Sequence, residues 1–159
     1  MSSSARICTP TIAAAIRSSS ARPSSFTVRR SKPRAPGAQA QGYLAVEWEQ
    51  DAPTDIIDGE RDVFDDGRVV LVPLPGHTPG MTGALVRLDK SGEFFLASDT
   101  VSFRATLDTG VVPKNTWNAE ALVKSLAEVK RIEAGGAKII YGHDAVQWAT
   151  LRTGADAYE

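Results

Sequence analysis

Three side chains that can bind a metal or move a proton lie just beyond apolar runs of this sequence: His77, Asp99 and His143. Taken singly, each has an ordinary explanation, because an aspartate after a strand often forms a turn and a histidine is often a partly buried hydrogen-bonding group. Taken together, two neutral imidazoles and a carboxylate are ligands that zinc accepts, at about 2.0–2.2 Å. We therefore expect a metal site if the fold brings these three residues to one end of a sheet.

His77 has the most informative surroundings. It lies in Pro75-Gly-His-Thr-Pro-Gly80, where two prolines and two glycines stiffen the turn and let other groups approach the backbone closely. A rigid loop at the end of a strand is a common place for binding and catalytic groups. Either Asp99 or Asp144 can orient a histidine from outside the coordination sphere of a metal.

The small number of possible ligands limits the chemistry. The chain of 159 residues contains two histidines and one cysteine, Cys8. A single cysteine excludes an internal disulfide framework and a cysteine-rich zinc finger. Cys8 has no neighbour that would activate its thiol, so we interpret it as exposed and inert.

Apolar and β-branched runs predict the strands that must position the candidate ligands. Strands are expected over residues 68–74, 84–88 and 93–97, with a weaker candidate over 43–48. The second and third of these flank the turn-forming residues 89–92, so we expect them to form an antiparallel pair.

One long helix is well marked in the sequence. Asn118 is its expected N-cap, apolar residues recur after it with helical spacing, and Gly135-Gly136 ends it. A short strand over 138–141 and a last short helix over 145–152 are expected to follow. An antiparallel sheet followed by helix, strand and helix makes an α+β fold.

The formal net charge of -1 conceals two segments of opposite charge. Residues 1–40 carry seven basic residues and no acidic one, whereas residues 41–159 carry 11 basic and 19 acidic residues, a net charge of −8. The first segment is rich in serine and has one aromatic residue, too little apolar surface to offset the entropy of ordering. We therefore predict a disordered tail over 1–40 and one domain over 41–159.

Three roles stay open for the tail: an organelle-targeting presequence, a basic arm, or a functionless N-terminus left by truncation or a wrong start. Nucleic acid is not the expected partner, because the basic residues of the tail are not interleaved with aromatics and the domain is acidic. No run approaches the roughly 20 apolar residues of a membrane helix, so no membrane partner is expected. The expected location is the cytoplasm, or an organelle if residues 1–40 direct the chain there.

Three segments, taken in order, resemble the second half of a metallo-β-lactamase-fold hydrolase, and specifically its N-acyl-homoserine lactonase-like branch. They are residues 69–80 with the Gly-His-Thr-Pro-Gly turn, Leu96-Ala-Ser-Asp-Thr100, and Ile140-Tyr-Gly-His-Asp144. Gln147-Trp148 and the closing Asp156-Ala-Tyr-Glu159 also resemble that branch. The resemblance covers about residues 41–159. It implies half of a four-layer αβ/βα sandwich, in which helices cover an antiparallel-rich sheet.

The resemblance implies a role for each candidate ligand. His77 would bind a first zinc ion, His143 a second, and Asp99 would bridge the two and serve as the catalytic carboxylate. In this family, paired zinc ions activate a hydroxide that attacks the carbonyl of a lactone, ester or amide. The expected cofactor is therefore zinc, as one or two ions, and the expected substrate is a small lactone or other acyl compound.

The principal metal motif of the family, His-x-His-x-Asp-His, is absent from this sequence, because both of its histidines belong to the later motifs. We therefore expect weak or partial zinc binding by the chain alone. A sheet without its other half would expose an apolar face, which predicts self-association or a complementing chain. Lactonase-like members also often carry a tyrosine shortly after the bridging aspartate, where Ser102 and Phe103 stand here.

Three functions remain open on these grounds. The chain is a truncated lactonase-like zinc hydrolase that acts when another chain completes it, a non-catalytic remnant, or a module that binds a partner through the exposed sheet face. Metal content and lactone opening distinguish the first function from the other two.

Overall fold

The computed structural model describes residues 27–29, 54–153 and 157–159 of the chain. The chain divides into two units, one of Pro23–Asp58 and one of Met1–Arg22 with Gly59–Glu159. The candidate ligands His77, Asp99 and His143 all belong to the second unit.

The first unit contains two short strands, β1 (Thr27–Arg29) and β2 (Thr54–Ile56), which pair in parallel. β1 falls inside the segment that the sequence predicts to be disordered, and these three residues are strand instead. The predicted strand over 43–48 and the predicted boundary at residue 40 lie outside the described residues.

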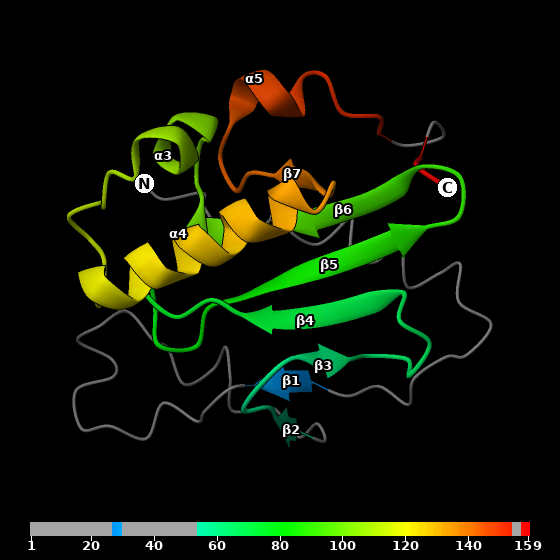
Figure 1. The fold of residues 1–159 in the computed structure, drawn as a ribbon, viewed down its shortest axis with the longest axis horizontal. Helices are drawn as coiled ribbons and strands as arrows, with labels where there is room; N and C mark the ends of the chain where they lie inside the picture. The colour runs from blue at the N-terminus through cyan, green and yellow to red at the C-terminus, as the bar shows by residue number, and fades with distance from the viewer. Residues whose placement is uncertain (1–26, 30–53, 154–156) are drawn as a thin grey trace, which may run out of the picture. The chain divides into compact units, whose positions relative to one another are not determined.

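The second unit is built on a five-stranded sheet in the order β3-β4-β5-β6-β7 (Figure 1). Its strands are β3 (Arg61–Asp62), β4 (Val69–Pro73), β5 (Thr82–Leu88), β6 (Gly92–Leu96) and β7 (Lys138–Ile140). Neighbours pair antiparallel from β3 to β6, and β7 joins β6 in parallel. The strands predicted over 68–74, 84–88, 93–97 and 138–141 are confirmed, and so is the antiparallel pairing of β5 with β6. β3 was not predicted, because two residues in an acidic, turn-rich stretch carry no strand pattern.

Strand direction decides where the candidate ligands meet. β4 and β6 both run antiparallel to β5, and β7 runs parallel to β6, so β4, β6 and β7 all end at the same end of the sheet. His77, Asp99 and His143 each follow one of these three strands within a few residues. The topology therefore gathers them at one end of the sheet.

Helix α4 (Ala119–Ala134) lies in the connection between β6 and β7 and covers one face of the sheet (Figure 1). A connection of this kind is what allows β7 to lie parallel to β6. Asn118 caps the helix, because its Oδ1 accepts a hydrogen bond of 2.9 Å from the N–H of Ala121. Its apolar side joins the core with residues of the sheet: Leu74, Phe95, Leu122, Leu126 and Val129 are all buried in one cluster. The predicted helix and its N-cap are confirmed, and so is the α+β class.

Short helices fill the connections at the end of the sheet where the candidate ligands lie. The 3-10 turn η2 (Ser98–Thr100) and helix α3 (Arg104–Thr109) follow β6, and α5 (Ala145–Trp148) follows β7. α5 is shorter than the predicted helix over 145–152, because the N–H and the hydroxyl of Thr150 both donate to the carbonyl of Gln147 and turn the chain. In the part of the chain that the structure describes, no helix is long and apolar enough to span a membrane.

Candidate metal centre

Asp99 stands between the two histidines, and each of its carboxylate oxygens faces a different imidazole. Oδ1 lies 2.7 Å from Nε2 of His143, and Oδ2 lies 3.9 Å from Nε2 of His77. The side chains of His77, Asp99 and His143 are 21%, 39% and 46% exposed, so solvent reaches the cluster. The structure therefore brings together the three residues that the sequence singles out.

A tight turn after β6 sets the position of Asp99. The N–H of Ala97 donates to the carbonyl of Ile140 at 3.0 Å, so the pairing with β7 continues up to the turn. Ser98 then adopts a left-handed backbone with φ of 51° and directs the chain into η2. Because such a conformation costs a non-glycine residue about 1–3 kcal/mol, the surrounding contacts must hold it.

Two backbone hydrogen bonds align His143 with Asp99. The N–H of Gly142 donates to the carbonyl of Val101 at 3.0 Å, and the N–H of His143 donates to the carbonyl of Ser102 at 2.9 Å. The segment after β7 is thus bonded to the segment after Asp99 at two successive residues. This pairing places the imidazole against the carboxylate without requiring either loop to be long.

The turn around His77 is fastened to the beginning of α4. The carbonyl of His77 accepts from the N–H of Trp117 at 3.1 Å, and the carbonyl of Gly76 accepts from the N–H of Asn118 at 3.0 Å. Gly76 has φ of 150° and packs so tightly that a Cβ there would lie 2.4 Å from Cα of Leu122. The close approach that the glycines of this turn predict is therefore present, and helix α4 is what approaches.

Side chains of α5 occupy the free edge of β7, the last strand of the sheet. Oε1 of Gln147 accepts from the N–H of Tyr141 at 2.9 Å, and Nε2 of Gln147 donates to the carbonyl of Ile139 at 2.6 Å. Trp148 donates from Nε1 to the carbonyl of Tyr141 at 2.8 Å. Backbone groups that a sixth strand would otherwise satisfy are bonded within the chain. The strand that leads to His143 is therefore held from both sides.

The carboxylate of Asp144 caps two helices, α5 and α3. Its Oδ1 accepts from the N–H of Gln147 at 3.1 Å, and its Oδ2 accepts from the N–H of Arg104 at 3.0 Å, so one carboxylate serves the first turns of α5 and α3. These hydrogen bonds favour the ionised form and lower the pKa of Asp144, with the N–H of Arg104 having the largest effect. Of the two carboxylates expected to orient a histidine, Asp99 is the one that contacts His143.

Arg104 links α3 to the neighbouring elements. Its guanidinium donates to Oη of Tyr141 at 3.0 Å and to Glu133 of α4, and it pairs with Asp108 at 2.9 Å. The hydrogen bonds to Tyr141 and Glu133 raise the pKa of Arg104. Burial in turn raises the pKa of Tyr141, so the phenol stays neutral at physiological pH.

The donor chemistry of the cluster suits zinc in two pairs of ligands. A carboxylate oxygen of Asp99 stands beside an imidazole nitrogen twice, once with His77 and once with His143. A carboxylate that offers its oxygens in two directions is suited to bridge two ions. Among the residues that the structure describes, no group of three or more His, Cys, Asp or Glu side chains is placed to hold one ion. Each pair therefore needs further ligands to complete a tetrahedral site.

The side chains that support the cluster carry little signal in the sequence. The hydrogen bonds from the side chains of Gln147 and Trp148 to the edge of β7 follow no characteristic residue spacing, so the sequence does not predict them. Asp144 is the exception, because an aspartate three residues before a glutamine resembles a capping box and marks the beginning of α5. The loop before α4 that holds the His77 turn through Trp117 has no comparable marker.

Comparison with known proteins shows what the chain resembles. No family model matches the chain. The N-acyl homoserine lactonase AttM of Azorhizobium caulinodans is 32% identical over 114 residues, which are 65% of this chain and 40% of that protein. The N-acyl homoserine lactonase AttM of Rhizobium johnstonii is 29% identical over 98 residues, which are 61% of this chain and 37% of that protein. The chain thus spans about 40% of the length of these curated relatives.

Solved structures share the fold. An N-acyl homoserine lactone hydrolase with the product N-hexanoyl-L-homoserine at its catalytic metal centre matches with a TM-score of 0.67 and 22% identity, over 84% of this chain and 52% of that chain. A quorum-quenching N-acyl homoserine lactone hydrolase matches equally well, over 84% of this chain and 53% of its own.

The chain therefore has the metallo-β-lactamase fold of these solved structures and matches about half of each. Within that class, the chain resembles the N-acyl-homoserine lactonase-like branch, over part of the length of its members. The fold class and the resemblance expected from the three sequence segments are confirmed. The zinc ligands and the substrate stay predictions.

Proposed function

We propose that the chain forms part of a zinc-dependent hydrolase of the lactonase type, which opens lactones or related esters. The observation that carries the proposal is the placement of Asp99, whose two carboxylate oxygens lie 3.9 Å and 2.7 Å from Nε2 of His77 and His143. In this proposal, His77 and Asp99 would hold one zinc ion, and His143 and Asp99 would hold a second. The relatives named N-acyl homoserine lactonases support the reaction class.

Zinc, when bound, lowers the pKa of water and polarises a carbonyl oxygen, which is the chemistry that lactone opening requires. The contribution of this chain is to hold the ligands in place before the metal arrives. Backbone hydrogen bonds fix the turns that carry Asp99 and His143, so little ordering accompanies their use as ligands. Because Asp99 lies beside both His77 and His143, both proposed zinc positions depend on it.

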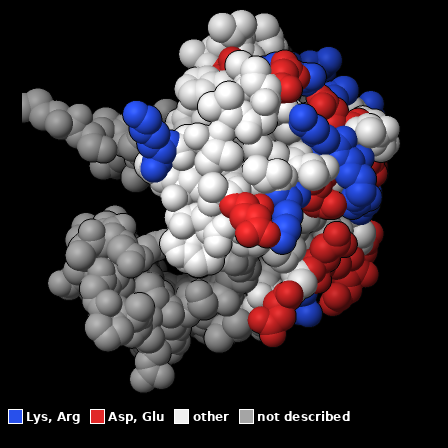
Figure 2. All heavy atoms as spheres, turned by 60° about the vertical axis from the view of Figure 1, so that its left-hand side comes forward, with Lys and Arg blue, Asp and Glu red and all other residues white. Residues whose placement is uncertain are grey.

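Exposed apolar side chains near the cluster suit an acyl substrate. The side chain of Trp117 is 55% exposed, and the backbone N–H of Trp117 donates to the carbonyl of His77. Phe103 is 49% exposed and follows Ser102, whose carbonyl accepts from the N–H of His143. Figure 2 brings forward the end of the unit with α3 and the beginning of α4 and shows a largely uncharged centre with charged side chains toward one margin. Small-molecule sites commonly combine such apolar surface with a few polar groups.

The proposed centre needs ligands beyond His77, Asp99 and His143. With Asp99 shared, each ion has one imidazole and one carboxylate oxygen, and the sequence contains no third histidine. We therefore propose that ligands from outside this sequence complete the centre, and a complementing chain or another copy is the expected source. The compartment also stays a proposal, namely the cytoplasm or an organelle addressed by residues 1–40. A binding module without activity of its own is the second candidate, and the lack of a three-ligand group among the described residues favours it.

Zinc binding by the purified chain tests the proposal. In equilibrium dialysis against Zn²⁺, we expect Asp99→Asn and His143→Ala to weaken binding by about tenfold or more. Asp89→Asn is the matched control, because Asp89 is an exposed carboxylate in the turn between β5 and β6. Zinc affinity that does not depend on Asp99 or His143 would contradict the ligand assignment.

Hydrolysis of N-hexanoyl-L-homoserine lactone separates the remaining alternatives. Ring opening by the zinc-loaded chain, lost in Asp99→Asn, supports the hydrolase and shows that no second polypeptide is needed. If the chain binds zinc through Asp99 but opens the ring only after a complementing chain is added, the result supports a centre whose ligands come from both chains. Binding of such a chain without any ring opening identifies the binding module instead.

A further inference from the structure

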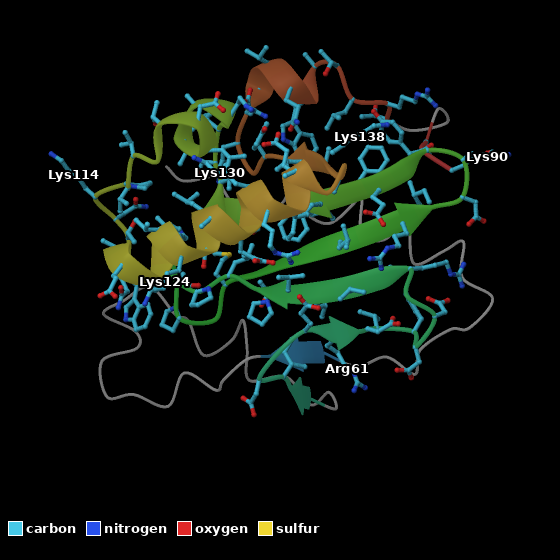
Figure 3. All side chains as sticks on the ribbon, in the orientation of Figure 1. Arg61, Lys90, Lys114, Lys124, Lys130 and Lys138 are labelled. Atoms are coloured by element: carbon cyan, nitrogen blue, oxygen red, sulfur yellow. The ribbon has the colours of Figure 1, made fainter. Side chains whose placement is uncertain are left out.

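A second candidate site lies at the opposite end of β6 and β7 from Asp99 and His143. It is a pocket of about 660 Å³ between the β5–β6 turn, the first residue of β7 and residues 157–159. The side chains that give it its character are three basic groups and one acidic group: Lys90, Lys138, Arg152 and Glu159. Figure 3 shows Lys90 at the turn and Lys138 at the beginning of β7.

This pocket is basic within an acidic domain. Residues 41–159 carry 11 basic and 19 acidic residues, whereas the described side chains that line the pocket are three basic ones and one acidic one. Glu159 pairs with Lys90, with Oε2 2.6 Å from Nζ, and this pairing raises the pKa of Lys90. Lys138 and Arg152 form no ion pair with any carboxylate that the structure describes. The excess charge of the pocket therefore resides on these two residues.

Two aromatic rings hold these two cations in place. Nζ of Lys138 lies 5.0 Å from the ring centroid of Phe94, and the guanidinium carbon of Arg152 lies 5.2 Å from that of Tyr158. The two rings contact each other, with centroids 4.7 Å apart, so both cations rest on one aromatic pair. Cations held in this way lose little side-chain freedom when a ligand binds.

Donors for an anion are available in this arrangement. Lys138 donates one N–H to the carbonyl of Ser91 at 3.2 Å, which leaves two of its three N–H groups for a ligand. The guanidinium of Arg152 carries five N–H donors, and none of them donates to an acceptor among the described residues. The pocket thus offers the planar fork of Arg152 and the point charge of Lys138 beside one aromatic pair.

We propose that this pocket binds a phosphate group, either as free phosphate or as part of a small phosphorylated molecule. The fork of Arg152 matches two phosphate oxygens, and the ammonium group of Lys138 supplies a charge for a third. A phosphate dianion also offsets the positive charges of Lys138 and Arg152. A lone carboxylate would engage Arg152 and leave Lys138 without a partner. The site is separate from the proposed metal centre, so neither proposal depends on the other.

Titration of inorganic phosphate and of phenyl phosphate into the full chain, in phosphate-free buffer, tests the proposal. Calorimetry or NMR should give a Kd below about 1 mM for at least one of them. Lys138→Gln and Arg152→Gln should each weaken binding by about tenfold. Lys130→Gln is the matched control, because Lys130 is an exposed lysine on α4 outside the pocket, and it should change nothing. Tighter binding of phenyl phosphate identifies a phosphorylated molecule as the ligand, and equal binding identifies the phosphate group alone.

Glu159→Gln gives a result that a poorly folded variant cannot imitate. The substitution removes the acidic side chain of the pocket and releases Lys90 from its ion pair. We expect phosphate binding to tighten by about threefold, in line with the modest value of an exposed ion pair. Absence of binding at about 10 mM phosphate, or binding that Lys138→Gln and Arg152→Gln leave unchanged, would overturn the proposal.

Discussion

Gly142 lies against the backbone of Ser98 so closely that no side-chain atom fits between them. A Cβ on Gly142 would lie 2.7 Å from the carbonyl oxygen of Ser98 and 3.2 Å from Oδ1 of Asp99. The N–H of Gly142 also donates to the carbonyl of Val101, so the same two turns are bonded as well as packed. The separation of Asp99 from the turn that carries His143 is therefore set by a glycine.

Gly142→Ala should loosen this contact and displace Asp99. Because the nearest atom belongs to the backbone of Ser98 and not to a flexible side chain, the turn itself must move. We expect the free energy of unfolding to fall by about 1–3 kcal/mol, with weaker zinc binding, as measured by urea unfolding and dialysis. Gly59→Ala is the matched control, because a Cβ at Gly59 meets nothing within 4 Å. Equal losses in the two variants would show that the contact at Gly142 is unimportant.

Gly76→Ala should be more damaging than Gly142→Ala. A Cβ at Gly76 would lie 2.4 Å from Cα and 2.6 Å from the backbone N of Leu122, and the residue has φ of 150°. The helix backbone cannot yield as a side chain would, so the turn that carries His77 must separate from α4. We expect a loss of at least about 3 kcal/mol in urea unfolding, or failure to fold. Stability close to that of the wild type would mean that α4 does not fix this turn.

Asp144→Asn should make stability less sensitive to acid. In asparagine an NH2 group replaces one of the two oxygens, so the N–H of either Arg104 or Gln147 then faces a donor and loses its acceptor. The pKa of Asp144 is lowered from 3.8 in the folded state, so its contribution is present above that value and is lost as the pH falls. Between about pH 5 and about pH 3, the Tm of the wild type should therefore fall more steeply than that of Asp144→Asn. Circular dichroism at several pH values measures this, and Asp89→Asn should keep the wild-type slope.

Local patterns in the sequence identify the elements and the candidate ligands, but not the contacts between them. The β-branched run before His77, the aromatic run before Asp99 and the cap at Asn118 each act within a few residues. Convergence of the ligands also needs strand direction, which a short strand such as β7 does not show until its pairing with β6 is known. The last helix is also shorter than its sequence pattern predicts, because Thr150 bonds to the carbonyl of Gln147 and turns the chain.

The contacts that hold the site in place join distant residues. Asp144 accepts from Arg104, 40 residues away in sequence, and Ser125 donates to the carbonyl of Pro75, 50 residues away. Bonds from a side chain to a distant backbone group depend on how elements pack and leave no periodic pattern. For this reason, the sequence indicates which residues form the candidate site and leaves open what supports them.

Gln147→Ala should expose the free edge of β7. The amide of Gln147 takes the place of a neighbouring strand, because it bonds to the N–H of Tyr141 and to the carbonyl of Ile139. Leaving these two groups without partners should lower the free energy of unfolding by about 1–3 kcal/mol. Val146→Ala is the matched control on the same helix, because Val146 is 80% exposed, and it should change stability by less than about 0.5 kcal/mol.

Gln147→Glu separates the two hydrogen bonds. Glutamate keeps the acceptor for the N–H of Tyr141, but an ionised carboxylate cannot donate to the carbonyl of Ile139, which lies 2.6 Å from Nε2 in the wild type. Below about pH 4 the protonated acid regains a donor, so its deficit in stability should shrink as the pH falls. Amide hydrogen exchange at Tyr141 should be fast in Gln147→Ala and slow in Gln147→Glu. Slow exchange in both variants would show that water or another group satisfies this edge and that Gln147 does not hold the strand leading to His143.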